Sequence, residues 1–188
     1  MIKAFVLIKN GFEEVEALTV VDYLRRAEID IKIVSTEEGL ELQGAHGIKI
    51  IADMAFDELD RDDIDLIFLP GGMPGATSLK DDEKVLELIT YLNDKGRAIS
   101  AICAAPIVLE AAGVIEDKTV TSYPSFDEKL PSIGEYSQDI VVIDENIITS
   151  RGPATAVYLA LELIELLKGR ETKEAIRKDI LLDLIEDR

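Results

Sequence analysis

Hydrophobic positions along this chain alternate between short continuous runs and longer stretches with helical spacing. The runs that are apolar almost throughout, as buried strands are, lie at residues 2–8, 31–35, 66–69 and 98–102. The stretches with helical periodicity lie at residues 13–27, 82–95, 104–112, 153–168 and 172–185. Apolar strands that alternate with helices predict a mainly parallel sheet covered on both faces. We therefore expect an α/β fold of the doubly wound, flavodoxin-like kind.

Weaker segments complete the predicted architecture. Short β-like segments lie near residues 119–122, 140–143 and 147–150. Two further segments, 40–42 and 48–51, flank the sequence QGAHG and predict a β-hairpin appended to the main sheet. No repeat or linker interrupts the alternation, and 188 residues suffice for one substantial core. We expect residues 1–188 to form a single domain.

Charge and composition narrow the classes of function. The formal net charge of −18 argues against a nucleic-acid partner, because phosphates require a basic surface. No apolar run approaches the roughly 20 residues needed to cross a bilayer, so no membrane association is expected. The chain has one cysteine, which cannot form an internal disulfide. A lone cysteine suits a reducing compartment, and we expect a cytoplasmic protein.

The most informative stretch is AISAICAAP, residues 98–106. It predicts a buried strand, a sharp turn at Cys103 and a helix with Pro106 in its first turn, where the missing N–H costs nothing. Nucleophile-elbow enzymes present a reactive side chain at such a corner. A helix N-terminus also favours thiolate over thiol, which predicts a lowered pKa for Cys103. The alternative is that Cys103 is a small buried hydrophobe, and this segment alone leaves both open.

Two other loops are expected at the same edge of the sheet as Cys103, because ligands gather beyond the carboxyl ends of parallel strands. The first contains Glu13, Glu14 and Glu16, which open a helix and could serve only to complement its dipole. The second contains Gly71 and Gly72, which could form a plain tight turn. A backbone without Cβ atoms could also bring N–H groups close to a reacting atom.

The motifs GFEEVEA, LPGG, AICAAP and SRGPATA, in this order, resemble the ThiJ/PfpI superfamily on its DJ-one branch, over about residues 2–168. The superfamily has a class I glutamine amidotransferase-like domain. The resemblance implies that Cys103 is a nucleophile, Glu16 its carboxylic partner, and the N–H groups of Gly72 and Ala104 the backbone donors. It further implies a pocket bordered by Gly71, Arg26, Tyr123, Pro153 and His46. A homodimer is implied, with the first helix and the hairpin near the interface.

The chain departs from this family at its histidines. Many members place a histidine beside the cysteine or on the loop that follows, where this chain has Ala104 and Tyr123. The one histidine, His46, lies in the hairpin turn, and we favour an exposed turn residue over a functional one. A cysteine peptidase needs a general base beside its thiol, and none is visible. One cysteine and one histidine cannot assemble a closed thiolate–imidazole site, so no metal and no cofactor are expected.

A thiol and a carboxyl group in contact should not both ionise readily. We expect a Cys103 thiolate that accepts a hydrogen bond from protonated Glu16, the two titrating as a unit. Such a pair could act on small reactive carbonyls in the manner of a glyoxalase or deglycase, or could sense peroxide as a stress-response protein through oxidation to sulfinic acid. The alternatives are a PfpI-like intracellular cysteine peptidase or amidase, and a non-enzymatic, chaperone-like interaction protein.

Overall fold

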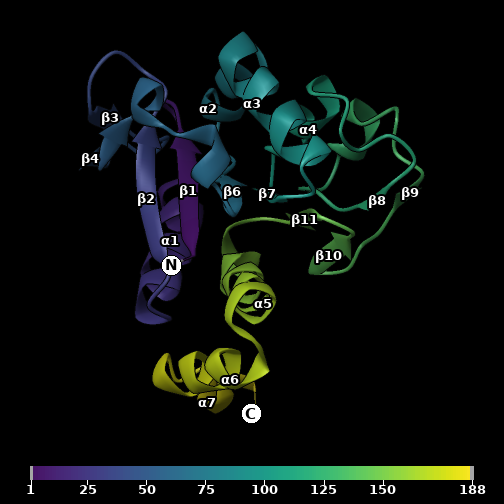
Figure 1. Ribbon diagram of the computed structural model, residues 1–188. Helices are drawn as coiled ribbons and strands as arrows, with labels where there is room; N and C mark the ends of the chain where they lie inside the picture. Colours follow the sequence, from purple (N-terminus) through teal and green to yellow (C-terminus); the bar gives the residue numbers. More distant parts are fainter. Residues whose placement is uncertain (1, 187–188) are drawn as a thin grey trace.

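The computed structural model describes residues 2–186. It has a central seven-stranded sheet with helices packed against it (Figure 1). The strands run in the order β10-β11-β7-β6-β1-β2-β5. Their bounds are β1 (Lys3–Ile8), β2 (Asp30–Ser35), β5 (Met54–Ala55), β6 (Leu66–Leu69), β7 (Ala98–Ile102), β10 (Val141–Asp144) and β11 (Ile147–Ser150). Neighbours are parallel except for β10 and β11. The expected fold class is confirmed.

Helices cover both faces of this sheet. One face carries α1 (Glu14–Arg26), α5 (Ala156–Lys168) and α6 (Arg170–Asp179), and the other carries α2 (Gly75–Lys80), α3 (Glu83–Asp94) and α4 (Pro106–Ala111). Strand β1 shows the consequence: Val6 and Ile8 pack into the first core cluster, whereas Phe5 and Leu7 pack into the second. Because side chains alternate between the two buried faces, the central part of β1, from Ala4 to Ile8, is apolar at every position.

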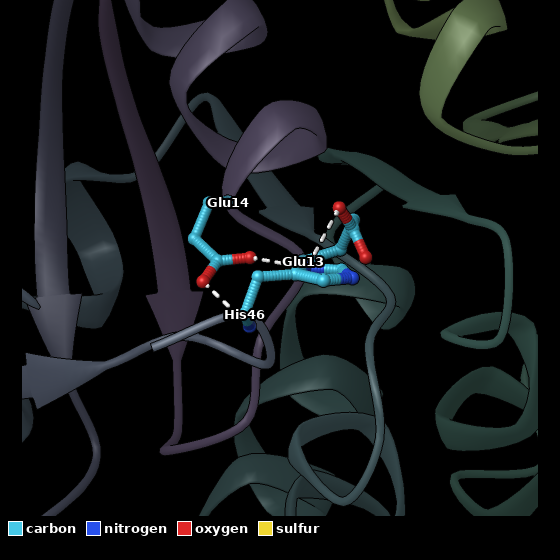
Figure 2. A group of neighbouring side chains, drawn as sticks. All are labelled: Glu13, Glu14 and His46. Carbon is cyan, nitrogen blue, oxygen red and sulfur yellow. Dashed lines mark hydrogen bonds and ion pairs between the residues drawn. The ribbon is translucent and has the colours of Figure 1, made fainter. Parts of the chain in front are cut away.

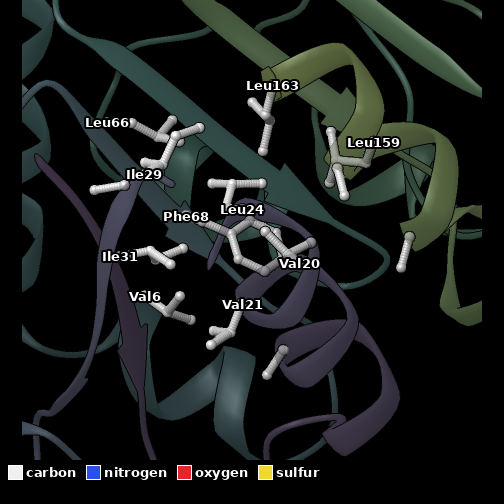
Figure 3. Packing of buried hydrophobic residues seen from close by; sticks show 14 of the residues in the cluster. Val6, Val20, Val21, Leu24, Ile29, Ile31, Leu66, Phe68, Leu159 and Leu163 are labelled. Carbon is white, nitrogen blue, oxygen red and sulfur yellow. The ribbon is translucent and has the colours of Figure 1, made fainter. Parts of the chain in front are cut away.

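Helix α1 is anchored firmly on the first face. Val20, Val21 and Leu24 of α1 are buried against Phe68 of β6, with Leu159 of α5 in the same cluster (Figure 3). Burial of each such side chain contributes about 1.5–3 kcal/mol. This packing fixes the orientation of α1, and therefore the direction in which side chains of its first turn point.

The carboxyl ends of β1, β6 and β7 lie side by side, because these strands are neighbours and parallel. The loops that follow them therefore open on one edge of the sheet, as expected for an α/β protein. Those loops contain the glutamates of α1, the Gly71–Gly72 turn and Cys103.

Several local elements differ from the sequence-based expectations. The expected β-hairpin is present as β3 (Glu41–Gln43) and β4 (Lys49–Ile51), which pair in a two-stranded sheet of their own, whereas the unexpected β5 extends the main sheet. Strand β8 (Thr119–Val120) pairs with the unexpected β9 (Glu135–Tyr136). Helix α2 was not expected either, because GATSLK is short and shows little apolar periodicity.

The prediction of a single helix at residues 172–185 is wrong. The chain forms α6 and a separate α7 (Asp183–Glu186), interrupted at Leu181, whose φ of 60° is incompatible with a right-handed helix. Short 3-10 turns lie at Phe56–Glu58, Arg61–Asp63, Asp127–Lys129 and Pro153–Thr155. Within residues 2–186, no helix has both the length and the apolar character needed to cross a membrane.

Candidate active site

Cys103 occupies a strained turn between β7 and α4. Its φ of 63° lies in the left-handed region, which costs a residue with a Cβ roughly 1–3 kcal/mol. Its N–H donates to the Ser150 carbonyl at 3.0 Å, and its own carbonyl accepts from the Tyr123 N–H at 2.9 Å. These bonds to two separate segments hold the turn, so the predicted elbow geometry is confirmed. Helix α4 begins at Pro106 rather than at residue 104.

Glu16 meets the elbow from α1. Its side chain is fully buried, and Oε2 accepts a hydrogen bond from the Gly71 N–H at 2.7 Å. The second oxygen, Oε1, is buried without a hydrogen-bond partner within residues 2–186. The Cys103 thiol lies close enough to this carboxyl group for the two to affect each other's ionisation. A Cβ at Gly71 would lie 2.7 Å from the Cys103 Cβ and 2.8 Å from Glu16 Oε2. The two side chains therefore flank one residue that must be glycine.

The structure separates the three glutamates that the sequence could not rank. Glu16 points toward Cys103, whereas Glu14 points toward the β3–β4 hairpin, where Oε1 accepts from the N–H of His46 at 2.8 Å. Glu13 places its carboxylate 3.6 Å from the His46 ring nitrogen Nδ1. These three acids have three different roles, and only Glu16 contacts the thiol.

Burial dominates the ionisation of Glu16. Loss of solvent raises the pKa of this carboxyl to about 7, against the opposing hydrogen bonds from the Gly71 N–H and the Cys103 thiol; the Glu13 charge adds to the increase. A group with this pKa exists near neutral pH in both its acid and its base form. That property is what a group that carries protons requires.

The expectation of a Cys103 pKa lowered by the helix N-terminus is wrong while Glu16 is ionised. Burial and then the Glu16 carboxylate raise the pKa of the thiol, and the N–H groups of Ala104 and Gly72 lower it by less. The reason is that α4 has only six residues and starts three positions beyond Cys103, so its dipole is a weak influence.

Protonation of Glu16 removes the second of these causes and leaves the effect of burial. It removes the opposing charge and gives the carboxyl group a proton to donate, so the sulfur then faces that O–H and the backbone N–H groups of Gly72 and Ala104. The pair therefore gains its first negative charge at about pH 7 and carries at most one near neutral pH, and its protons belong to both groups together.

Of the other expected site residues, some lie close to Cys103 and others lie far from it. The Tyr123 N–H donates a hydrogen bond to the Cys103 carbonyl. Pro153 is exposed in the turn just after β11. Gly72 adopts a φ of 90° and packs against the Glu13 N–H. Arg26 is not brought to the thiol of its own chain: it is exposed at the far end of α1, ion-paired with Asp22 and Asp179.

His46 lies at the tip of the hairpin and is exposed, as the sequence favoured. Its Nδ1 is 2.9 Å from Oε2 of the buried Glu14, so the exposed ring is nonetheless held in place (Figure 2). Sequence reasoning missed Glu14 as the anchor of the hairpin. The one local signal was Gly44 in QGAHG, because a Cβ there would lie 2.2 Å from the Glu14 carboxyl carbon.

The fold and this geometry define an α/β protein of the cysteine-elbow class, in which a strained turn presents a thiol to a buried carboxyl group. The sequence profile of the DJ-1/PfpI family matches residues 2–166. The chain belongs to the DJ-1/PfpI family.

Relatives resemble the chain in both sequence and structure. Protein dj-1beta of Drosophila melanogaster is 36% identical over 180 residues, which cover 95% of this chain and 96% of the relative. The crystal structure of Drosophila DJ-1beta superimposes with a TM-score of 0.92 at 36% identity, covering 96% of this chain and 97% of that one. Protein DJ-1 homolog B of Arabidopsis thaliana is also 36% identical over 90% of this chain, but the chain spans only 39% of that relative's length.

Two relatives have names that state an activity. Glutathione-independent glyoxalase DJR-1.2 of Caenorhabditis elegans is 33% identical over 172 residues, which cover 90% of each chain. Deglycase PH1704 of Pyrococcus horikoshii is 30% identical over 167 residues, covering 88% of this chain and 99% of the relative.

Proposed function

We propose that this protein is a cysteine-dependent stress-response enzyme that converts small reactive 2-oxoaldehydes, such as methylglyoxal, into hydroxy acids. The observation that carries the proposal is that Cys103 and the buried Glu16 carboxyl group both lie against Gly71, with a Glu16 pKa of about 7. The glyoxalase and deglycase names of two relatives support the same substrate class.

In the proposed reaction, the Cys103 sulfur adds to the aldehyde carbon and forms a hemithioacetal. Glu16 takes the thiol proton, if it is still present, and delivers it to the carbonyl oxygen that becomes a hydroxyl. Glu16 then removes the proton from the former aldehyde carbon and returns it to the adjacent carbon. The hydroxyl proton on the former aldehyde carbon passes to the neighbouring ketone oxygen, so the product is a thioester of the hydroxy acid. Water cleaves the thioester and restores the thiol. The sum is one aldehyde and one water to one hydroxy acid, without an external oxidant.

Backbone groups near the sulfur support this chemistry. The N–H groups of Gly72 and Ala104 point at the thiol, so they can also stabilise negative charge that develops on sulfur or on an adjoining oxygen. A single acid must perform every proton transfer, because no histidine lies beside the cysteine. A protonation equilibrium near neutral pH suits Glu16 to that double task.

The assay for this proposal is lactate formation from methylglyoxal. We expect wild type to form lactate, Cys103→Ala to form none, and Glu16→Gln to lose at least about a hundredfold in rate, since general acid–base catalysis contributes that much or more. Glu16→Gln should still be alkylated at Cys103, which separates the nucleophile from the proton carrier. The control is Glu87→Gln, an exposed glutamate of α3, which should match wild type. Equal lactate formation in all four proteins would rule out cysteine catalysis.

Peroxide sensing is a second candidate, favoured by the same donors around the sulfur. One peroxide would convert the thiolate to sulfenic acid and release water, and a second would give sulfinic acid. The N–H groups of Gly72 and Ala104 and a protonated Glu16 could donate hydrogen bonds to the sulfinate oxygens. Intact mass after mild peroxide tests this: the expected product carries two added oxygens on Cys103, and a mixture that proceeds to three, or stays unmodified, would contradict it.

The remaining alternatives have less support. A PfpI-like peptidase or amidase needs a base that can also protonate a leaving amine, and the only histidine of the chain is bonded to Glu14 instead. A chaperone-like role would leave Cys103→Ala fully functional, so the lactate assay separates it from catalysis.

We also propose a homodimer in a reducing cytoplasm. Val15 and Leu18 expose apolar side chains on α1, and Ile48 and Ile51 do so on the neighbouring hairpin. Exposed apolar side chains of this kind are covered when a chain pairs with a copy of itself. Light scattering should report twice the chain mass of 20.7 kDa, and a monomer that persists at high concentration would contradict the dimer.

A further inference from the structure

We propose that Glu13, Glu14 and His46 form a binding site for one divalent transition-metal ion, with Zn²⁺ as the representative, where the first turn of α1 meets the β3–β4 hairpin (Figure 2). One ligand atom from each residue lies within 4.8 Å of the others. The sequence offers one thiolate and one imidazole, too few for a closed metal site, but the fold adds two carboxylates to the histidine. The site does not depend on the proposed function of Cys103.

The distances between ligand atoms suit a single ion. His46 Nδ1 lies 2.9 Å from Glu14 Oε2 and 3.6 Å from Glu13 Oε1. An ion bound about 2.0–2.2 Å from nitrogen and oxygen ligands holds them roughly 2.9–3.6 Å apart, in octahedral or tetrahedral geometry. With small side-chain adjustments, the ion can therefore take the place of the proton in the hydrogen bond between His46 Nδ1 and Glu14 Oε2.

The ligands are held in place before any ion arrives. Glu14 uses Oε1 to accept hydrogen bonds from the N–H groups of His46 and Ile48, at 2.8 and 3.3 Å, which leaves Oε2 for an ion. The hairpin is fixed again where the Ala45 N–H donates to the Phe12 carbonyl at 2.8 Å. A site with little conformational freedom to lose binds an ion more tightly.

Glu13 supplies an observation independent of the other two residues. Only 14% of its side chain is exposed, and its carboxylate receives no hydrogen bond within residues 2–186. A largely buried carboxylate is stabilised by a nearby cation, and its one partner among the described residues is the His46 ring nitrogen at 3.6 Å. Here the cation would be the ion or, in its absence, a protonated His46.

The chemistry of the donors selects the class of ion. One imidazole and two carboxylates suit Zn²⁺ and its transition-metal neighbours better than Mg²⁺ or Ca²⁺, which prefer oxygen ligands alone. The net charge of −18 also attracts cations to the chain. In the single chain the imidazole is 67% accessible, which leaves room for water to complete the coordination.

The test is calorimetric titration of the EDTA-treated full-length protein with ZnCl₂, paired with the visible absorption of bound Co²⁺. Wild type should bind one ion per chain. His46→Gln and Glu13→Gln should each weaken binding at least tenfold and reduce the Co²⁺ absorption. Far-UV circular dichroism should show that both variants remain folded, because His46 is exposed and Gln matches Glu13 in shape.

Two further variants exclude other sites. Cys103→Ser tests the reactive thiol as the ligand, and Glu87→Gln tests non-specific binding to the acidic surface; both should bind Zn²⁺ as wild type does. The proposal is overturned if wild type shows no saturable binding, if either His46→Gln or Glu13→Gln binds as tightly as wild type, or if Cys103→Ser abolishes binding. Loss of lactate formation in Cys103→Ser would bear on the proposed function alone.

Discussion

Replacement of Glu16 by glutamine should change how the stability of the protein depends on pH. Burial raises the pKa of Glu16 from 4.5 to about 7 in the folded chain. Between these values the folded chain keeps a proton that the unfolded chain has lost, so stability falls as the pH rises through this window. Above this pH window, the buried charge of Glu16 lowers the unfolding free energy of wild type by about 3 kcal/mol. Glutamine accepts the same Gly71 hydrogen bond without a charge and avoids this cost.

The magnitude follows from the two pKa values. From about pH 5 to about pH 8, wild type should lose about 2.5 kcal/mol of unfolding free energy relative to Glu16→Gln. Urea unfolding of both proteins at the two pH values, in EDTA, measures this, and the contributions of the other acidic residues cancel in the difference. A difference that stays constant within about 0.5 kcal/mol would show that Glu16 has an ordinary pKa, and the reasoning about the pair would fail.

Other substitutions test neighbouring parts of the account. Gly71→Ala places a Cβ 2.7 Å from the Cys103 Cβ, so it should slow iodoacetamide alkylation of Cys103 at least tenfold and lower the melting temperature; wild-type alkylation would refute the tight packing. Glu14→Ala leaves two hairpin N–H groups without an acceptor and should cost about 1–3 kcal/mol, with faster amide exchange at residues 44–48; unchanged exchange would refute the anchoring role. Leu24→Ala removes a fully buried side chain of α1 and should cost about 2–5 kcal/mol in urea unfolding; a cost below about 1 kcal/mol would mean that α1 is not held by this core.

The sequence predicted the elements whose signals are local. Strand β7 matches its expected bounds at both ends, because an apolar run closed by a proline-containing helix start is unambiguous. The turn at Cys103 follows directly from that junction. Helix α2 and the break at Leu181 lacked such signals, because one is short and the other depends on a single backbone conformation.

The roles of the glutamates could not be predicted from sequence, because they depend on how α1 is rotated against the sheet. That rotation is set by residues such as Leu24 and Phe68, which are distant in the chain and meet only in the folded core. Arg26 shows the same limit. It lies ten residues beyond Glu16 on one helix, a rise of about 15 Å, so a single chain cannot bring both to one pocket.

The central claim is that Cys103 and Glu16 share their protons and act as one group, and the pH dependence of Cys103 alkylation tests it most directly. In wild type the rate should reach half its maximum at about pH 7, where the pair loses its first proton, and Glu16→Gln should move this midpoint upward, because burial still raises the pKa of the thiol. A midpoint near the ordinary thiol value of about 8.5, left unmoved by Glu16→Gln, would contradict this claim.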